Sequence, residues 1–350
     1  MRPTLVAGTL LVACSATGAG PVVAGPSPSL EPQPGVRFSS ASSEPKRLTA
    51  SELLVPGVGP YSFGHVACER ERRRVWVPAG STGRVEVLDI ATGTFTPISG
   101  FGRTTHHGGP SAAALGDGFA FVLNGGTGEV CPVSITTLKR GKCLGIGWLE
   151  EGAFVASAHE LWITQRAPQL IILDAVRPEA LAVKALVALP STPRGVVVDQ
   201  AHGIFFTNLE NGSTVATNVA SRHLTASFRS TCETDGLRGL AFDAARNILF
   251  VACADHVEAR DPAHDGAMLD RLETGAGVDG IDYLASKKLL YVAAGESGRL
   301  TVARVGDGGR FGVYATADTA PGAVNAVADR EGNAYVADPL RARLLVVAAE

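Results

Sequence analysis

The sequence predicts an all-β protein in which seven four-stranded antiparallel sheets form a ring, closed by an N-terminal strand that completes the last sheet. The main observation is a repeat. Short apolar segments recur seven times, and their aromatic residues, 41 to 45 positions apart, are Trp76, Phe121, Trp162, Phe205, Phe250, Tyr291 and Tyr335. A fixed period of about 40–45 residues with one aromatic strand per period is typical of a β-propeller.

The second observation is the local pattern inside each repeat. The apolar segments are short, β-branched or aromatic, and bounded by Gly, Asn, Asp and Pro, whereas helical repeats would carry apolar residues at i, i+3, i+4 and i+7. The sixth repeat predicts a complete blade, with strands at 280–284, 289–293, 300–305 and 310–316. Turn-forming residues separate these four strands.

The seventh repeat lacks a fourth strand, because only residues 343–347 follow its aromatic strand before the chain ends at Glu350. A strand-like segment at 46–56 precedes the first repeat. We expect this segment to close the ring as the outer strand of the seventh blade. Closure would cover sheet edges that otherwise invite aggregation.

The chain before the propeller divides into two parts. Residues 1–13 read as a secretory signal peptide, because one Arg precedes an apolar run far shorter than the roughly 20 residues of a membrane span. Residues 14–45 are rich in Gly, Pro, Ser and Ala and predict a flexible tether. The propeller is expected over 46–350.

The end of the signal segment, Leu11-Val12-Ala13-Cys14, resembles the lipobox of bacterial lipoproteins. The resemblance implies cleavage before Cys14 and attachment of diacylglycerol to its thiol. Ser15 after the cysteine implies sorting to the outer membrane of a Gram-negative cell. The alternative is an ordinary signal peptide with a chance cysteine.

Residues 327–338, Val-Ala-Asp-Arg-Glu-Gly-Asn-Ala-Tyr-Val-Ala-Asp, resemble an NHL-type repeat. The repeated Tyr-Val-Ala-like strands and Gly83-Arg-Val-Glu-Val-Leu-Asp89 resemble the YVTN propellers of the bacterial YncE-like group. This resemblance covers about residues 48–350. Its motifs are structural and the functions of that group are diverse, so it implies the fold and leaves the function open.

The cysteines after the tether suggest disulfides in an exported chain, which meets oxidising conditions. Cys131 and Cys143 are expected across one hairpin, and Cys232 and Cys253 at ends of neighbouring blades on the same face. Each disulfide would contribute about 2–4 kcal/mol to stability. The alternative is that all four are small buried thiols. No Cys-x-x-Cys occurs, so the usual zinc and redox patterns are missing.

The loops that lead into the inner strands converge on the central channel and carry polar residues of several types. Such a convergence can form a ligand site, and its candidate residues are His65, His106, His107, Arg194, Arg238, Asp279 and Asn325. The two arginines precede Gly195 and Gly239 at matching places and could bind a carboxylate or phosphate bidentately. Alternatively, they hydrogen-bond to blade carbonyls and keep the rim solvated.

These observations favour a lipid-anchored, monomeric, non-enzymatic module of the cell envelope that binds a small molecule or an envelope protein without a cofactor. No catalytic motif is present, and a net charge of −3 does not favour the binding of nucleic acid. The alternative is a metal-assisted propeller lyase or hydrolase, similar to streptogramin lyases, with an ion held by His65, His106, His107 and Glu150. No spacing motif supports that ligand set.

Overall fold

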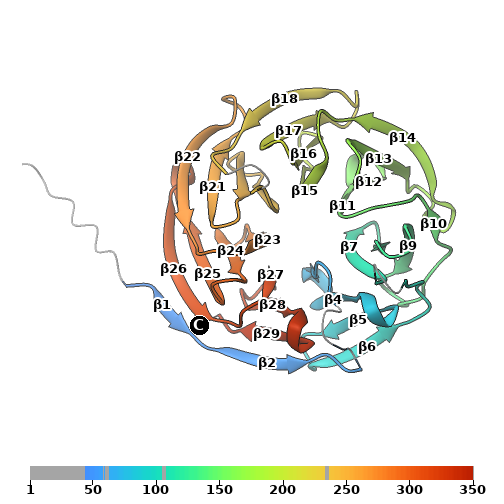
Figure 1. Cartoon of the computed structure of the whole chain (residues 1–350), viewed down its shortest axis with the longest axis horizontal. Helices are drawn as coiled ribbons and strands as arrows, with labels where there is room; N and C mark the ends of the chain where they lie inside the picture. The colour runs from blue at the N-terminus through green and yellow to red at the C-terminus, as the bar shows by residue number, and fades with distance from the viewer. Residues whose placement is uncertain (1–43, 58, 60–62, 105–107, 233–235, 350) are drawn as a thin grey trace, which may run out of the picture. The chain divides into compact units, whose positions relative to one another are not determined.

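The computed structural model describes residues 44–57, 59, 63–104, 108–232 and 236–349. Over this part the chain forms seven β-sheets arranged as blades around a central channel, as the sequence predicts (Figure 1). The propeller is one compact unit over Glu44–Glu350. Cys14 lies outside the described residues, as do the predicted signal peptide and all but the last two residues of the predicted tether.

The first four blades each contain four consecutive strands. Blade 1 has β3 (Ala67–Glu69), β4 (Arg74–Ala79), β5 (Arg84–Asp89) and β6 (Thr94–Ile98); blade 2 has β7 (Pro110–Gly116), β8 (Phe119–Asn124), β9 (Glu129–Ser134) and β10 (Leu144–Gly145); blade 3 has β11 (Gly152–Val155), β12 (Glu160–Thr164), β13 (Gln169–Asp174) and β14 (Ala182–Ala188); blade 4 has β15 (Pro193–Asp199), β16 (Ile204–Leu209), β17 (Ser213–Asn218) and β18 (Leu224–Arg229).

The last three blades follow the same plan, and the N-terminal strands join two of them. Blade 5 has β19 (Leu240–Asp243), β20 (Ile248–Ala252), β21 (His256–Asp261) and β22 (Ala267–Glu273); blade 6 has β23 (Val278–Leu284), β24 (Leu289–Ala294), β25 (Arg299–Val305), β26 (Phe311–Asp318) and β1 (Lys46–Leu48); blade 7 has β27 (Val324–Ala328), β28 (Ala334–Asp338), β29 (Arg343–Val347) and β2 (Ala50–Leu54).

Short 3-10 helices lie in the connections, where they occupy single turns. They are η1 (Arg70–Arg72), η2 (Gly80–Thr82), η3 (Ala156–Ala158), η4 (Pro178–Ala180), η5 (Asp307–Gly309) and η6 (Pro339–Arg341). Within the described part of the chain, no helix is long and apolar enough to cross a membrane.

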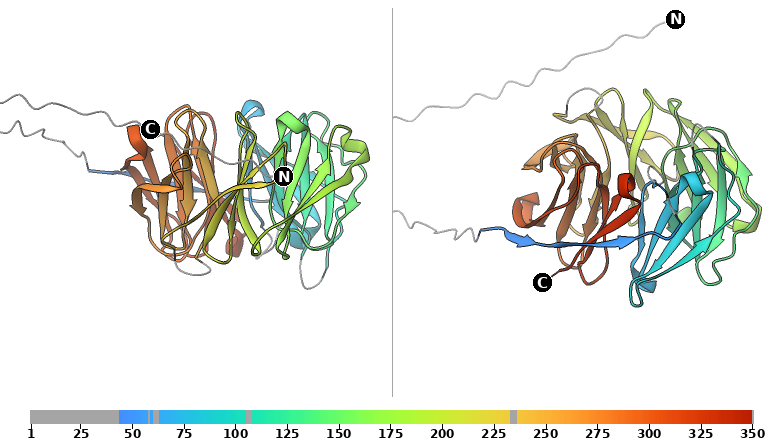
Figure 2. Two further views of the ribbon diagram at one scale, coloured as in Figure 1. Left: turned by 90° about the horizontal axis from the view of Figure 1, so that it is seen from above. Right: turned by 60° about the horizontal axis from the view of Figure 1, so that its bottom comes forward.

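The N-terminal strands close the ring (Figure 2). β2 pairs with β29 in antiparallel register over five residues and is the outer strand of blade 7. The predicted single strand is split, however, because β1 pairs in parallel with β26 and widens blade 6. The eight-residue β26 offers an open edge, and Lys46 lies 5.6 Å from the centre of the Tyr314 ring. The N-terminal segment therefore fastens two blades at their outer rim.

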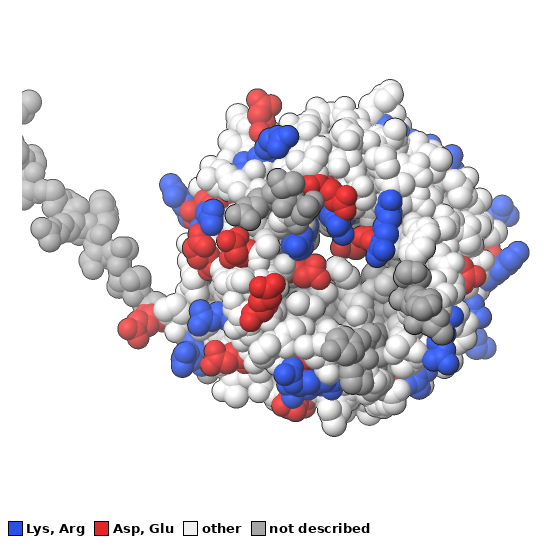
Figure 3. Space-filling model, in the orientation of Figure 1, with Lys and Arg blue, Asp and Glu red and all other residues white. Residues whose placement is uncertain are grey.

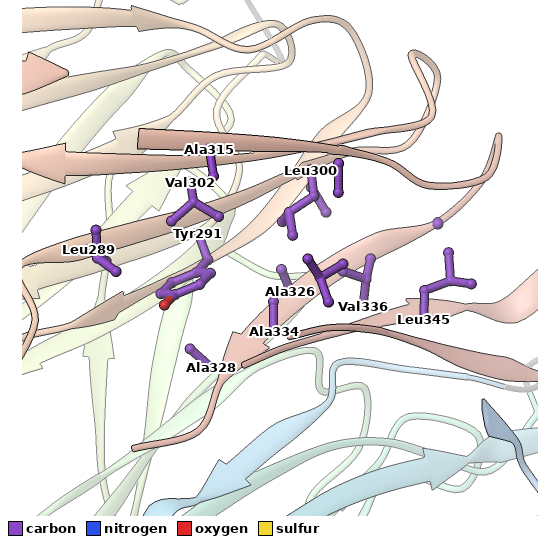
Figure 4. Packing of buried hydrophobic residues seen from close by; sticks show 14 of the residues in the cluster. Leu289, Tyr291, Leu300, Val302, Ala315, Ala326, Ala328, Ala334, Val336 and Leu345 are labelled. Atoms are coloured by element: carbon purple, nitrogen blue, oxygen red, sulfur yellow. The ribbon is translucent and has the colours of Figure 1, made fainter. Parts of the chain in front are cut away.

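The repeated aromatic residues lie in the second strand of each blade and fill the space between blades. Tyr291 is 1% exposed and faces the alanine-rich inner strands of blade 7 (Figure 4). Ala326, Ala328 and Ala334 leave room for its ring, and its hydroxyl donates a hydrogen bond of 2.9 Å to the Gly332 carbonyl. A large residue on one blade thus fits small residues on the next.

The four cysteines offered by the sequence form two disulfides. Cys131 bonds to Cys143 within blade 2, and Cys232 bonds to Cys253 between blades 4 and 5. Cys68 is a free, half-buried thiol in the inner strand of blade 1.

Candidate functional site at the channel mouth

The candidate site lies on one face of the ring, where the outer strand of each blade leads into the inner strand of the next. We call this face the mouth face. His65 precedes β3, Glu151 precedes β11, and Asp279 lies at the start of β23. Because all inner strands begin at the same end of the channel, residues from blades far apart in sequence meet here. Figure 3 shows acidic and basic side chains around the centre of the ring.

His65 connects three blades across the channel. Its Nδ1 lies 3.7 Å from Oε1 of Glu151, and its Nε2 lies 4.0 Å from Oδ2 of Asp279. The backbone fixes this position, because the His65 N–H donates to the Ser111 carbonyl at 2.7 Å. Any side chain at Gly64 would place its Cβ 1.8 Å from that carbonyl oxygen, so this close approach requires glycine.

The carboxylates around His65 crowd one another. Burial raises the pKa of Glu151, and the nearby charges of Asp279 and Glu150 raise it further, against the opposing effect of His65. Burial by itself would lower the pKa of His65, but Glu151, Asp279 and Glu150 outweigh that effect and raise it. The mouth therefore favours a positive charge between these carboxylates.

Arg194 lies in the same cluster but is already paired with carboxylates. Its Nη2 lies 2.6 Å from Glu210 and its Nη1 lies 3.6 Å from Glu150. Glu150 also accepts a hydrogen bond of 2.6 Å from Arg166, whose guanidinium lies 5.5 Å from the ring centre of Trp148. The Arg194 guanidinium thus balances acidic side chains of the protein itself.

The mouth cluster, as we use the term, has four acidic and three basic members. They are Glu150, Glu151, Glu210, Asp279, His65, Arg166 and Arg194. With His65 neutral, four carboxylates face two guanidinium groups, so the cluster carries a formal charge of −2. This excess of negative charge suits a cationic ligand better than an anion.

The remaining candidate residues lie in other surroundings. Arg238 lines a neighbouring pocket of blade 5, and its Nη1 donates to the Leu237 carbonyl at 3.1 Å. The Asn325 side chain accepts a hydrogen bond of 2.7 Å from the Gly280 N–H, inside the channel. Arg194 pairs with Glu150 and Glu210, whereas Arg238 lines the pocket of blade 5. His106 and His107 lie outside the described residues.

An open pocket of about 530 Å³ lies beside the mouth cluster. Glycines of blades 1 and 2 and of the connections that lead into them line it, together with Glu150, Glu151 and His65. Trp148 lines the same pocket and is 51% exposed, which is unusual for so large an aromatic side chain. His65 and Glu151 also line a cavity of about 150 Å³ in the channel.

The geometry around His65 bears on the alternative of a metal-dependent enzyme. The two ring nitrogens face different carboxylates on opposite sides of the imidazole. A single ion can bind only one of these nitrogens, so Glu151, His65 and Asp279 do not converge on one point as the ligands of a metal centre do.

Comparisons with known proteins identify the fold. No protein-family model matches the sequence, and no curated protein sequence matches it. Among solved structures, a chain of the Mitotic Checkpoint Complex has a TM-score of 0.73 at 12% identity, over 94% of this chain and 99% of that chain. Hydrazine synthase of Kuenenia stuttgartiensis gives 0.70 at 15% identity, over 84% of this chain and 99% of that chain.

A third similar structure is the Cps50 (Swd1) β-propeller domain of Myceliophteria thermophila. Its TM-score is 0.70 at 10% identity, over 86% of this chain and 100% of that domain. At these identities the likeness shows the β-propeller fold alone.

Proposed function

We propose that this chain is an exported, lipid-anchored, non-enzymatic binding module of the bacterial cell envelope, and that its mouth binds a basic segment of a protein partner. The observation that carries the proposal is the crowding of Glu150, Glu151 and Asp279 around His65. A Lys or Arg side chain placed among these carboxylates would lower their mutual repulsion.

Trp148 supports a polypeptide partner. Its exposed indole lies beside Glu150 and Glu151, and an Arg guanidinium can stack on such a ring while it pairs with a carboxylate. Arg166 already makes both contacts within the chain. A partner's arginine could make the same pair of contacts from outside. Propellers commonly serve as protein-binding scaffolds, and one of the similar structures is a multi-protein complex.

The lipobox-like segment that ends at Cys14 supports the proposed cellular setting. Acylation of Cys14 would leave about 30 residues before β1, and a flexible chain of that length spans roughly 30 Å. β1 joins the outer rim of blade 6, away from the inner strands that begin at the channel mouth. Attachment at the rim would leave the mouth open to a partner.

The binding proposal is tested by photo-cross-linking in envelope membranes of the native bacterium. A photoreactive residue replaces Trp148 in the full-length chain, and the control replaces Asp117, in the β7–β8 turn at the opposite face. We expect a protein cross-linked at position 148 that is competed by a tetra-arginine peptide and absent at position 117. Equal cross-linking at both positions would contradict binding at the mouth.

The anchor is tested separately by labelling cells with an alkyne fatty acid. The wild-type chain should be labelled and the Cys14→Ser variant should not. Labelling of both variants, or of neither, would remove the anchor from the proposal and leave binding at the mouth standing.

The enzyme alternative is tested by metal analysis of the purified full-length chain. A stoichiometric ion that is lost on His65→Ala or His107→Ala would favour a metal-assisted lyase or hydrolase over the binding module.

A further inference from the structure

A second cluster of chemically active side chains lies near the mouth face, between blades 4 and 5. Cys253 and His256 flank the turn between β20 and β21, where the Cys253 N–H donates to the His256 carbonyl at 2.8 Å. Cys232 arrives from the connection after β18 and bonds to Cys253. The two sulfur atoms and one His256 ring nitrogen all lie within 4.8 Å of one another.

The surroundings of His256 resemble those of a metal-binding histidine. The side chain is 3% exposed, and its Nδ1 lies 2.5 Å from Oδ1 of Asp255. A carboxylate on one ring nitrogen fixes the tautomer and leaves the lone pair on the other, as is usual for metal ligands. Nε2 is buried and makes no hydrogen bond among the described residues, and the carboxylate nearest to it, Oε1 of Glu258, lies 3.7 Å away. A buried histidine with a ring nitrogen that makes no hydrogen bond, in a cluster with two sulfurs, is a candidate metal ligand.

We propose that Cys232, Cys253 and His256 form a redox-gated binding site for a thiophilic divalent cation such as Zn²⁺. In the oxidised chain the disulfide blocks the site. In the reduced chain the two thiolates and Nε2 of His256 bind the ion. Tetrahedral coordination with Zn–S bonds of about 2.3 Å needs sulfurs about 3.8 Å apart, so reduction and a small separation of the two side chains suffice.

The chemical steps balance. A trialkylphosphine and one water cleave the S–S bond, which takes up two electrons and two protons, and the phosphine becomes its oxide. Binding of the cation then releases the two thiol protons, because the thiolate is the metal ligand. Three protein ligands leave a fourth position for water or an outside donor.

The pocket beside the cluster gives that fourth position access to solvent. Its volume is about 550 Å³, and Cys253, His256, Asp255, Arg271 and Glu296 line it. The nearby Glu258 has several partners. Its Oε1 accepts a hydrogen bond of 2.8 Å from the Thr231 N–H and lies 3.7 Å from Nε2 of His256, and its Oε2 lies 2.7 Å from Arg260. The fourth position is therefore open to Glu258 or to an exogenous ligand.

The test is a titration of the full-length, phosphine-reduced chain with Co²⁺ under anaerobic conditions. We expect one equivalent to give the intense sulfur-to-cobalt charge-transfer bands and the visible bands of a tetrahedral site, both displaced by Zn²⁺. The oxidised chain should give neither. The Asp255→Asn variant should bind about 10–100-fold more weakly, because the carboxylate that holds Nδ1 of His256 is lost.

The matched control is the Cys131→Ser/Cys143→Ser variant, which removes the other disulfide and should keep the full cobalt spectrum. The His256→Ala variant, checked for folding by circular dichroism, should lose the tetrahedral bands. Three results would overturn the proposal. The reduced chain could bind cobalt only in octahedral form, the oxidised chain could bind cobalt as tightly as the reduced chain, or the thiolate-to-cobalt bands could vanish in the control variant.

Discussion

Removal of the Cys232–Cys253 disulfide should destabilise the propeller by an amount set by the loop that the bond closes. The two cysteines are 21 positions apart, and Cys131 and Cys143 are 12 positions apart. Chain entropy for closed loops of these lengths corresponds to about 3.4 and about 2.9 kcal/mol respectively. The Cys232→Ser/Cys253→Ser variant should therefore lose about 3.4 kcal/mol of its free energy of unfolding.

Equilibrium unfolding in urea, followed by tryptophan fluorescence without reductant, measures this loss. With a slope of about 3 kcal/mol per M, the midpoint should fall by about 1.1 M for this pair and about 1 M for Cys131→Ser/Cys143→Ser. Both variants should remain folded in the absence of urea. The proposed metal site requires this, because it forms only when the disulfide is broken and the chain is still folded. A midpoint within about 0.3 M of the wild type would refute the loop-entropy reasoning for that bond.

Three further predictions concern the core, the mouth and the free thiol. The Phe250→Ala variant should lose about 3–5 kcal/mol in urea unfolding, because the fully buried ring lies 5.0 Å from that of Tyr283; a loss below about 1 kcal/mol would contradict the packing. The pKa of His65, followed by NMR, should lie above its usual value and should fall in the Glu151→Gln variant. The stability that protonated His65 adds is present below pH about 6.5 and is lost as the pH rises through the raised pKa. The His65→Gln substitution should therefore destabilise the protein more at pH 5 than at pH 8. Burial raises the pKa of the Cys68 thiol to about 12, so iodoacetamide at pH 8 should alkylate it far more slowly in the native than in the unfolded chain; equal rates would contradict its burial.

The fold could be predicted from the repeat period, because each blade buries one aromatic strand against its neighbour. In blade 6 the predicted strands 280–284, 289–293, 300–305 and 310–316 agree with β23 to β26 within two residues at each end. The pairing of β1 with β26 was not predictable, because a parallel partner 269 positions away leaves no local pattern. Only the folded ring shows which outer edges the N-terminal segment reaches.

The location of the site could be predicted from the sequence, but the pairs that its side chains form could be predicted less well. The sequence places His65 and Asp279 at equivalent points of different blades, but ring closure decides that Glu151 lies on the other side of the imidazole. Glu210 was not predicted, because it lies after the second strand of blade 4 and not in a loop that leads into an inner strand. Its pairing with Arg194 depends on how the strands of blade 4 are arranged in space. Trp148 stands two positions before Glu150, and that proximity was an available signal.

The second cluster was missed for a related reason. Cys253 and His256 form a Cys-x-x-His pair on one hairpin, which is visible in the sequence. The third ligand, Cys232, comes from the neighbouring blade, so no sequence spacing typical of a metal site is present.

The most direct test of the central claim is the affinity of the full-length chain for a tetra-arginine peptide, measured by calorimetry at pH 8. Two carboxylates worth about 1 kcal/mol each predict that Glu151→Gln/Asp279→Asn weakens binding about thirtyfold. Asp117→Asn, which removes a carboxylate paired with His159 in the turn at the opposite face, should have no effect. Wild-type binding should weaken as the pH falls through the raised pKa of Glu151 and this carboxylate takes up a proton. Equal affinity of the wild type and the double variant, or a preference for tetra-glutamate, would contradict a mouth that binds basic segments.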